Sequence, residues 1–365
     1  MVVRTCVSAA VAVGAVASFS SAATPQAQRV YHIGNSVTDT INYPGLATLA
    51  ATRGDTHNWG RHMIPGAPLS WIYGHPNDGF RTNPQAPAGS TENQGYPVAL
   101  PNYEWDAITL QPFDRQLGTP TAVETAPDDD LPTIRAYLGL LRQNAANHDT
   151  SVYIYSRWPR RNNETSTDNN SLNYQQQWDR TYTGGWDGTN ETRDYFQKVT
   201  DGTRTIVDDL AGSGTKNPVF MVPVGDVFYE IDKRAEAGQF SPGSGIDDVV
   251  DFYTDGIHFG NLGSYVVALT FYSTMYHEDP NGLGVPTEWA NQLGTGAGHF
   301  DFPNASSFSP LRGDLTAADV ALLQDAVWDV VNGHPYSGVN AVVPEPTTLG
   351  LLSVAGLFAL RRHRR

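Results

Sequence analysis

Apolar residues along this chain alternate between short continuous runs and longer stretches with helical spacing. The short runs are rich in β-branched and aromatic residues, and they predict strands over 29–33, 57–64, 103–110, 151–158 and 218–224. The longer stretches predict helices over 43–53, 129–146, 191–211 and 260–276. The last of these is almost entirely apolar, so we expect it to be buried. A final helix is predicted after Thr316, with Asp319 at capping-box spacing.

Strands separated by helical segments predict an α/β fold with a parallel sheet that is covered on both faces. The body of the chain, 29–335, contains no internal repeat and no linker. We therefore expect one domain. A polar insertion interrupts it over 160–190, directly after the predicted fourth strand. A loop of this length in a compact domain is usually functional or disordered, and this one leaves the sheet at its carboxyl edge.

The first 23 residues are typical of a secretory signal peptide. Arg4 is followed by an apolar stretch from Val7 to Phe19 and then by small residues, which predicts cleavage after Ala23 by signal peptidase. Residues 24–28 are then a short linker to the domain. A buried N-terminal helix is disfavoured because the segment has no polar face.

The last 22 residues have a different pattern, which follows a linker over 336–343. In the segment 344–365, a Pro-Glu-Pro motif precedes an apolar run from Leu349 to Leu360 and a basic tail. The run rises about 18 Å as a helix, short of the roughly 30 Å of a bilayer core. This three-part pattern resembles the PEP-CTERM sorting signal of Gram-negative bacteria. The resemblance implies transient membrane contact, cleavage by an exosortase-type protease, and delivery to the cell envelope or the outside. A generic tail anchor is the alternative.

Composition narrows the possible partners of this chain of 365 residues. A hydrophobic content of 40% and an aromatic content of 11% exclude a disordered chain. The formal net charge of −15 argues against nucleic acid and anionic lipid as partners. Cys6 is the one cysteine and lies in the signal segment, which excludes an intrachain disulfide and multi-cysteine metal sites. His57 and His62 flank the predicted second strand without metal-ligand spacing to carboxylates, so no metal is expected.

A candidate nucleophile follows the first predicted strand. Ser36 comes after Gly34-Asn35, where a strand turns into a helix and backbone N–H groups are exposed. A serine at this position is also a common helix N-cap, and that alternative stays open.

A candidate base lies near the other end of the domain. Asp255 precedes His258 by three residues, in a loop before the apolar helix. At this spacing the carboxylate can hold one ring N–H and leave the other nitrogen free as a base. The same pair is also common on ordinary protein surfaces.

Together the two motifs resemble the SGNH (GDSL-type) hydrolase superfamily, in the branch whose first block reads Gly-Asn-Ser. The order and spacing of the blocks match over 29–335, and further matching residues are Trp105, Asp106, Leu110, Gln111, Asn261 and Gly263. The resemblance implies a flavodoxin-like three-layer sandwich with a central parallel sheet of about five strands. It also implies a serine esterase without cofactor, in which Ser36, His258 and Asp255 are catalytic.

The same resemblance suggests an oxyanion hole. Its second block falls at residues 64–67, so that the backbone N–H of Gly66 would join that of Ser36. The third block departs from the family pattern Gly-x-Asn-Asp, because this chain has Gln111-Pro112-Phe113-Asp114. Gln111 carries an amide that could replace the missing Asn, whereas the Asp114 carboxylate would repel an oxyanion.

The expected function is hydrolysis of O-acyl esters, with O-acetyl groups on carbohydrate as the favoured substrate and other small esters as further substrates. The carbohydrate part depends on export, on family habit and on Trp178 and Trp186 in the polar insertion, which we expect to stack on sugar faces. Packing of these two rings within the insertion is the alternative. A non-catalytic, glycan-binding envelope or matrix protein on the same fold is the alternative function.

Overall fold

The computed structural model describes residues 26–113, 115–122, 127–161, 173–184, 191–290 and 315–340. At its centre is a six-stranded sheet with the order β3-β2-β1-β4-β5-β6. The strands are β1 (Ala27–Gly34), β2 (Thr56–Met63), β3 (Phe80–Thr82), β4 (Ala107–Leu110), β5 (Ser151–Tyr155) and β6 (Val219–Val222). All neighbouring pairs are parallel except β2 and β3, which pair antiparallel at the edge. The expected fold class, a three-layer sandwich around a mostly parallel sheet, is confirmed.

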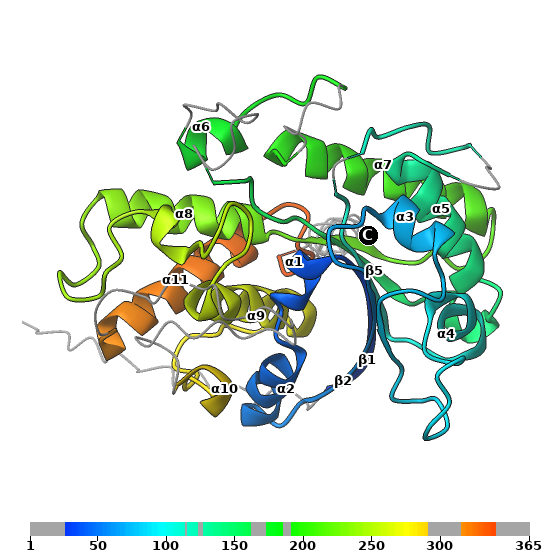
Figure 1. Cartoon of the computed structure of the whole chain (residues 1–365), viewed down its shortest axis with the longest axis horizontal. Helices are drawn as coiled ribbons and strands as arrows, with labels where there is room; N and C mark the ends of the chain where they lie inside the picture. The colour runs from blue at the N-terminus through cyan, green and yellow to red at the C-terminus, as the bar shows by residue number, and fades with distance from the viewer. Residues whose placement is uncertain are drawn as a thin grey trace, which may run out of the picture.

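Helices cover both faces of the sheet (Figure 1). One layer holds α2 (Tyr43–Thr52), α8 (Val224–Glu236), α9 (Asn261–Tyr276), α10 (Thr287–Ala290) and α11 (Ala317–Gly333). The other layer holds α3 (Leu69–Gly74), α4 (Tyr96–Asn102), α5 (Asp130–Leu141) and α7 (Arg193–Ala211). Two short helices complete the arrangement: α1 (Ser36–Asp39) follows β1, and α6 (Tyr174–Trp178) packs on α8. The 3-10 turns are η1 (Ala145–Asn147) and η2 (Val249–Phe252).

The apolar pattern explains the position of α9. All 16 of its residues are buried, because the helix packs against the sheet while α2 and α11 cover its other sides. The predicted Thr316–Asp319 capping box is present at the start of α11, with side chain and backbone bonded in both directions. Among the described residues, no helix has both the length and the apolar character needed to span a bilayer.

Several elements differ from the sequence prediction, which did not include β3, α3, α4, α6, α8 or α10. β4 begins at Ala107 and not at residue 103, because the Trp105 N–H donates to the side chain of Asn147 (2.9 Å) and not to a neighbouring strand. Pro223 ends β6, and the chain continues directly into α8, which the sequence analysis missed. The apolar positions of α8 do have helical spacing: Val224, Val227, Phe228, Ile231 and Ala235 are all buried.

The domain is slightly longer at both ends than predicted. β1 starts at Ala27, inside the expected linker 24–28, and pairs there with Thr56. At the other end, the Tyr336 carbonyl accepts the N–H of Met221 on β6 (2.8 Å), and the following Ser337 is fully buried. Residues 336–339 therefore belong to the domain and not to a linker. The predicted signal peptide and sorting segment lie outside the described residues.

Candidate active site

Ser36 lies at the carboxyl end of β1, between β2 and β4 (Figure 1). This is the point where the order of the parallel strands reverses, and open α/β sheets bind ligands there. The N-cap of α1 is Asn35, whose side-chain oxygen accepts the Val37 N–H at 3.0 Å. Ser36 is therefore the first helical residue and not the cap, which removes the alternative reading of its position.

Asn35 also connects the serine turn to the loop after β2. Its Nδ2 donates to the carbonyl oxygen of Ala67 at 3.2 Å, so that one side chain holds both Val37 and the loop over 64–67. Gly66 in that loop has φ +67°, a conformation that favours glycine. In the described ranges, no acceptor engages the backbone N–H of Ser36 or of Gly66. These are the two backbone groups that the sequence analysis expected at an oxyanion hole.

The Gln111 side chain makes hydrogen bonds that the sequence analysis did not anticipate. Its side chain is buried, its Oε1 accepts the Asn35 N–H and the Thr38 hydroxyl (both 3.1 Å), and its Nε2 donates to the Pro112 carbonyl oxygen (3.0 Å). A Cβ at Gly34 would lie 2.8 Å from the Gln111 Cβ, so the glycine permits this close approach. The amide oxygen therefore holds the serine turn and Pro112 takes one N–H of the amide, so the expected third oxyanion donor could only be the second N–H of Nε2. Asp114 lies outside the described residues.

The structure brings Ser36, His258 and Asp255 together in one hydrogen-bonded chain. His258 Nε2 lies 2.8 Å from Ser36 Oγ, and His258 Nδ1 lies 2.7 Å from Asp255 Oδ2. Because a carboxylate only accepts, Nδ1 carries the proton and Nε2 is left to accept from the serine hydroxyl. The other carboxylate oxygen, Oδ1, accepts the backbone N–H groups of Ile257 (2.8 Å) and His258 (2.7 Å).

These hydrogen bonds keep Asp255 ionised. Burial raises the pKa of Asp255, but the hydrogen bonds from the His258 ring and from the two backbone N–H groups outweigh burial and lower this pKa from 3.8 to about 2. A negative charge therefore lies against Nδ1 of His258 at all pH values well above 2. It favours a positive charge on the imidazole when Nε2 takes up a proton.

The segment after β5 supports the histidine loop. Trp158 donates from Nε1 to the Ile257 carbonyl oxygen (2.7 Å), and its ring stacks on Phe259 with centroids 3.8 Å apart. The backbone N–H of Arg161 donates to the Gly256 carbonyl oxygen (2.9 Å). Gly263 leaves room for Phe259, since a Cβ there would lie 2.5 Å from that side chain. The sequence analysis did not find Trp158, because nothing in the strand pattern distinguishes it from core.

A buried ion pair between Asp39 and Arg61 supports the short helix that begins with Ser36. Asp39, at the end of α1, accepts from Arg61 of β2 at 2.5 Å and from the Tyr43 hydroxyl at 3.0 Å. The Arg61 guanidinium also lies over the rings of Tyr43 and Phe80. Because α1 contains both Ser36 and Asp39, this pair ties the serine helix to the neighbouring strand.

Trp178 does not offer a ring face to a sugar. Its side chain is fully buried in α6, its ring lies against Gly225, and its Nε1 donates to Asp226 Oδ1 (2.9 Å). The expectation of sugar stacking is therefore wrong for this residue, and the alternative of packing is correct. The reason is that the insertion folds back on α8, whose Gly225 has no side chain to keep the indole away. Trp186 lies outside the described residues.

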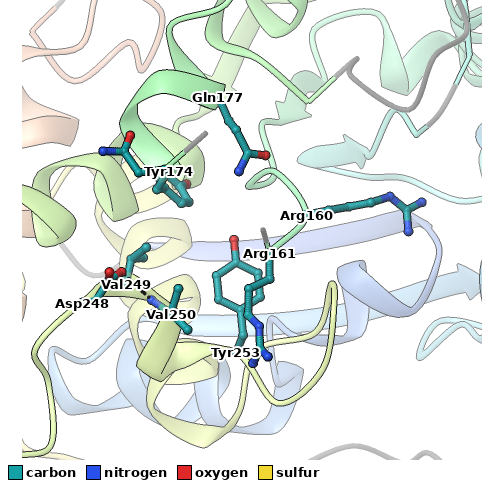
Figure 2. A pocket seen from close by; sticks show the side chains of 9 residues that line it. Arg160, Arg161, Tyr174, Gln177, Asp248, Val249, Val250 and Tyr253 are labelled. Atoms are coloured by element: carbon teal, nitrogen blue, oxygen red, sulfur yellow. Dashed lines mark hydrogen bonds between the residues drawn. The ribbon is translucent and has the colours of Figure 1, made fainter. Parts of the chain in front are cut away.

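The described part of the insertion does wall a small pocket beside the histidine loop (Figure 2). The lining residues are Arg160, Arg161, Asn173, Tyr174, Gln177, Asp248, Val249, Val250 and Tyr253. In Figure 2, Gln177 and the Tyr253 hydroxyl point toward the middle of the pocket, whereas Arg160 extends away from it. The pocket has a volume of about 20 Å³, which is room for a water molecule but not for a sugar ring.

Comparisons with known proteins support the C-terminal prediction. Residues 342–365 match the model of the PEP-CTERM protein-sorting motif. The expected sorting motif is thus confirmed. The motif indicates export and association with the envelope of Gram-negative bacteria, with processing by an exosortase.

The fold also has relatives among solved structures. A DUF4886 family protein from Bacteroides uniformis superposes with a TM-score of 0.50 at 16% identity, over 84% of this chain and 95% of that chain. At this identity the likeness shows the fold alone. A gut microbial diltiazem-metabolizing enzyme matches with a TM-score of 0.31 and 12% identity, over 68% of this chain and 47% of that chain, which is too weak to support an argument. No curated protein matches the sequence.

Proposed function

We propose that this exported protein is a serine esterase that hydrolyses O-acyl esters, with O-acetyl groups on carbohydrate as its substrates. The observation that carries the proposal is the hydrogen-bonded chain from Ser36 through His258 to Asp255 at the carboxyl edge of the sheet. The three residues come from opposite ends of the domain. Their meeting at the strand-order reversal, with the correct ring nitrogen turned to each partner, fits nucleophilic catalysis.

In this mechanism Ser36 Oγ attacks the ester carbonyl carbon while its proton passes to His258 Nε2. The imidazolium that results lies against the ionised Asp255. The tetrahedral oxyanion accepts hydrogen bonds from the backbone N–H groups of Ser36 and Gly66. The carbon–oxygen bond to the alcohol then breaks, and His258 protonates the departing alkoxide. Water attacks the acyl-serine with His258 as base, the carboxylic acid leaves, and Ser36 regains its proton.

The oxyanion hole of this proposal has two backbone donors from the described residues, because the Gln111 oxygen is bonded to the serine turn and one N–H of its amide is taken by Pro112. Losing one donor of such a hole typically lowers the rate by roughly 10²–10³. The engagement of Gln111 is thus the observation that favours the second candidate function, a glycan-binding protein without catalysis on the same fold. Against it, the hydrogen bonds around His258 are those of a working base, which glycan binding alone does not require.

The test is hydrolysis of 4-nitrophenyl acetate by the purified protein. We expect turnover that falls by at least about 10³ in Ser36→Ala and in His258→Gln. Ser213→Ala, at an exposed position after α7, is the matched control and should keep the wild-type rate. Turnover by Ser36→Ala at the wild-type rate would refute the esterase. Absence of turnover in the wild type, together with binding of O-acetylated oligosaccharides, would support the second candidate.

A further inference from the structure

A sugar-binding surface for the proposed esterase must lie outside the pocket of Figure 2, which is too small, and away from Trp178, which is buried. Only two large apolar side chains are markedly exposed in the described part of the chain: Trp71 is 50% exposed and Phe80 is 36% exposed. Exposed aromatic side chains scattered over a surface need no explanation. These two belong to a single segment at the edge of the sheet that carries Ser36.

That segment, residues 64–80, leaves β2 after Met63 and ends at Phe80, the first residue of β3. Met63 pairs with Gly34 on one side and with Phe80 on the other. The whole excursion, including α3, therefore lies at the carboxyl edge beside the serine turn. In Figure 1, α1 and α3 lie at the same end of the sheet.

A short stretch of chain connects Trp71 to the turn that carries Ser36. Asn35 holds the Ala67 carbonyl oxygen, and Trp71 follows Ala67 by four residues, in the first turn of α3. Ser70 of the same turn faces the chain after β4, since its Oγ lies 3.3 Å from Arg115 Nε. Trp71 is thus five residues after Gly66, on the segment that Asn35 ties to the serine turn.

The Trp71 ring is held in place. The His75 imidazole stacks on it with centroids 4.0 Å apart and planes at 15°, and His75 Nδ1 donates to the Trp71 carbonyl oxygen at 2.8 Å. One face of the indole is therefore covered, and the exposed half of the side chain is the opposite face. Three neighbouring residues of α3 are buried, namely Leu69, Ser70 and Ile72, so the ring cannot move inward without displacing core residues.

We propose that Trp71, backed by His75, is an aromatic platform for a pyranose ring of the O-acylated glycan, on the β2 side of Ser36. A pyranose presents C–H groups on its faces and hydroxyls at its rim, so an indole with one open face and a rigid backing suits it. Phe80, at the end of the same segment, lies under the Arg61 guanidinium and is not part of this platform. This inference names the substrate class of the proposed esterase and depends on it.

The experiment compares two classes of substrate in three variants. The substrates are 4-nitrophenyl acetate and chemically O-acetylated xylotetraose and cellotetraose, with acetate release as the readout for the sugars. Trp71→Ala should raise the KM for the acetylated sugars about fivefold with little change in kcat, since an aromatic contact of this kind contributes on the order of 1 kcal/mol. It should leave 4-nitrophenyl acetate hydrolysis unchanged. Trp71→Phe should restore most of the KM. Asn77→Ala, at an exposed position of the same segment, is the matched control.

Three outcomes would overturn the platform while leaving the esterase intact. The first is equal loss on both classes of substrate, which would make Trp71 a structural support. The second is an altered preference among 4-nitrophenyl acetate, butyrate and octanoate, which would place the ring against the acyl chain. The third is hydrolysis of 4-nitrophenyl acetate without any hydrolysis of the acetylated sugars.

A binding measurement separates failure of the platform from failure of the esterase. Calorimetric titration of Ser36→Ala with the same acetylated tetraoses should show binding that weakens about fivefold in Ser36→Ala/Trp71→Ala. This loss, observed in a protein whose wild type hydrolyses no ester, would support the platform and refute the esterase. Equal affinity of the two variants would refute the platform whatever the hydrolytic activity.

Discussion

The side-chain oxygen of Gln111 accepts the backbone N–H of Asn35 at 3.1 Å, although 76 residues separate the two in the chain. The same oxygen accepts the Thr38 hydroxyl, so one amide holds both sides of Ser36. Because the whole contact is buried, neither donor has water as a substitute. These two hydrogen bonds hold the turn that carries Ser36, the nucleophile of the proposed esterase, against the end of β4.

Gln111→Leu should therefore lower kcat for 4-nitrophenyl acetate by about tenfold to hundredfold, because small displacements of a reacting group have effects of this size. The KM for this small ester should change little. Thr38→Val removes one of the two contacts and should have a smaller effect on kcat. Steady-state kinetics of both variants check this. A Gln111→Leu protein that unfolds more easily but keeps the wild-type kcat would show that the amide only stabilises the fold.

Asp255→Asn should lower kcat by about 10⁴, as in other Ser-His-Asp sites. The Asn oxygen can still accept the N–H groups of Ile257 and His258, so the loop should stay in place. The Asn amide, however, donates to Nδ1 of His258 and moves the ring proton to Nε2, which then cannot accept from Ser36. The matched control is Asp247→Asn, at an exposed position nearby, which should be fully active.

The pH–rate profile gives a second check on Asp255. Because the pKa of Asp255 is lowered to about 2, its titration should produce no transition in activity above about pH 4. A transition that appears there in the wild type and is lost in Asp255→Asn would contradict the ionised carboxylate that the mechanism requires.

Trp178→Ala should lower the free energy of unfolding by about 3–5 kcal/mol, because it removes a fully buried indole and leaves a cavity against Gly225. Trp71→Ala, at a position that is 50% exposed, should change it by less than about 0.5 kcal/mol. Urea unfolding followed by circular dichroism measures both. A small loss in Trp178→Ala would mean that the indole does not form part of the core.

Stability should fall as the pH is lowered from 7 to 5, because His32, His57 and His62 are buried in the neutral form. Burial lowers the pKa of His57 to about 3 and that of His62 to about 4. Below the unfolded-state pKa of about 6.5, the unfolded chain takes up protons that the folded protein does not. Each histidine should then cost about 2 kcal/mol between pH 7 and pH 5.

The slope of the free energy of unfolding against pH tests the contribution of His57. In His57→Gln the loss between pH 7 and pH 5 should be about 2 kcal/mol smaller than in the wild type. Tyr276→Phe removes the hydroxyl 3.0 Å from His57 Nδ1 but keeps the imidazole, so it should lower stability at both pH values and leave the slope unchanged. An unchanged slope in His57→Gln would mean that His57 takes up a proton in the folded state.

The sequence by itself determined the layers of this protein and the three residues of the candidate site. The period of apolar positions depends on local geometry, so the buried α9 and the strands around Ser36 could be predicted within a few residues. Ser36 follows from topology, because the carboxyl ends of parallel strands meet at one edge of the sheet. Asp255 and His258 lie in a loop before α9 and follow instead from their spacing and from the resemblance of their motif to the SGNH block. The sorting motif at 342–365 is likewise a local sequence signal, and it can be recognised without knowledge of the fold.

Only the tertiary structure decided what each polar or aromatic side chain contacts. The Gln111 oxygen is an acceptor for the serine turn, a role that the sequence could not indicate, because an amide offers donors and an acceptor and the contact comes from a distant part of the chain. Trp178 is buried and Trp71 is exposed, although both lie in short helices of aromatic and polar residues. Trp178 is buried because folding brings Gly225 of α8, which is distant in the sequence, against its ring. Long-range packing of this kind produces no periodic pattern in the sequence, because the exposure of a side chain depends on its distant neighbours as much as on the residue itself.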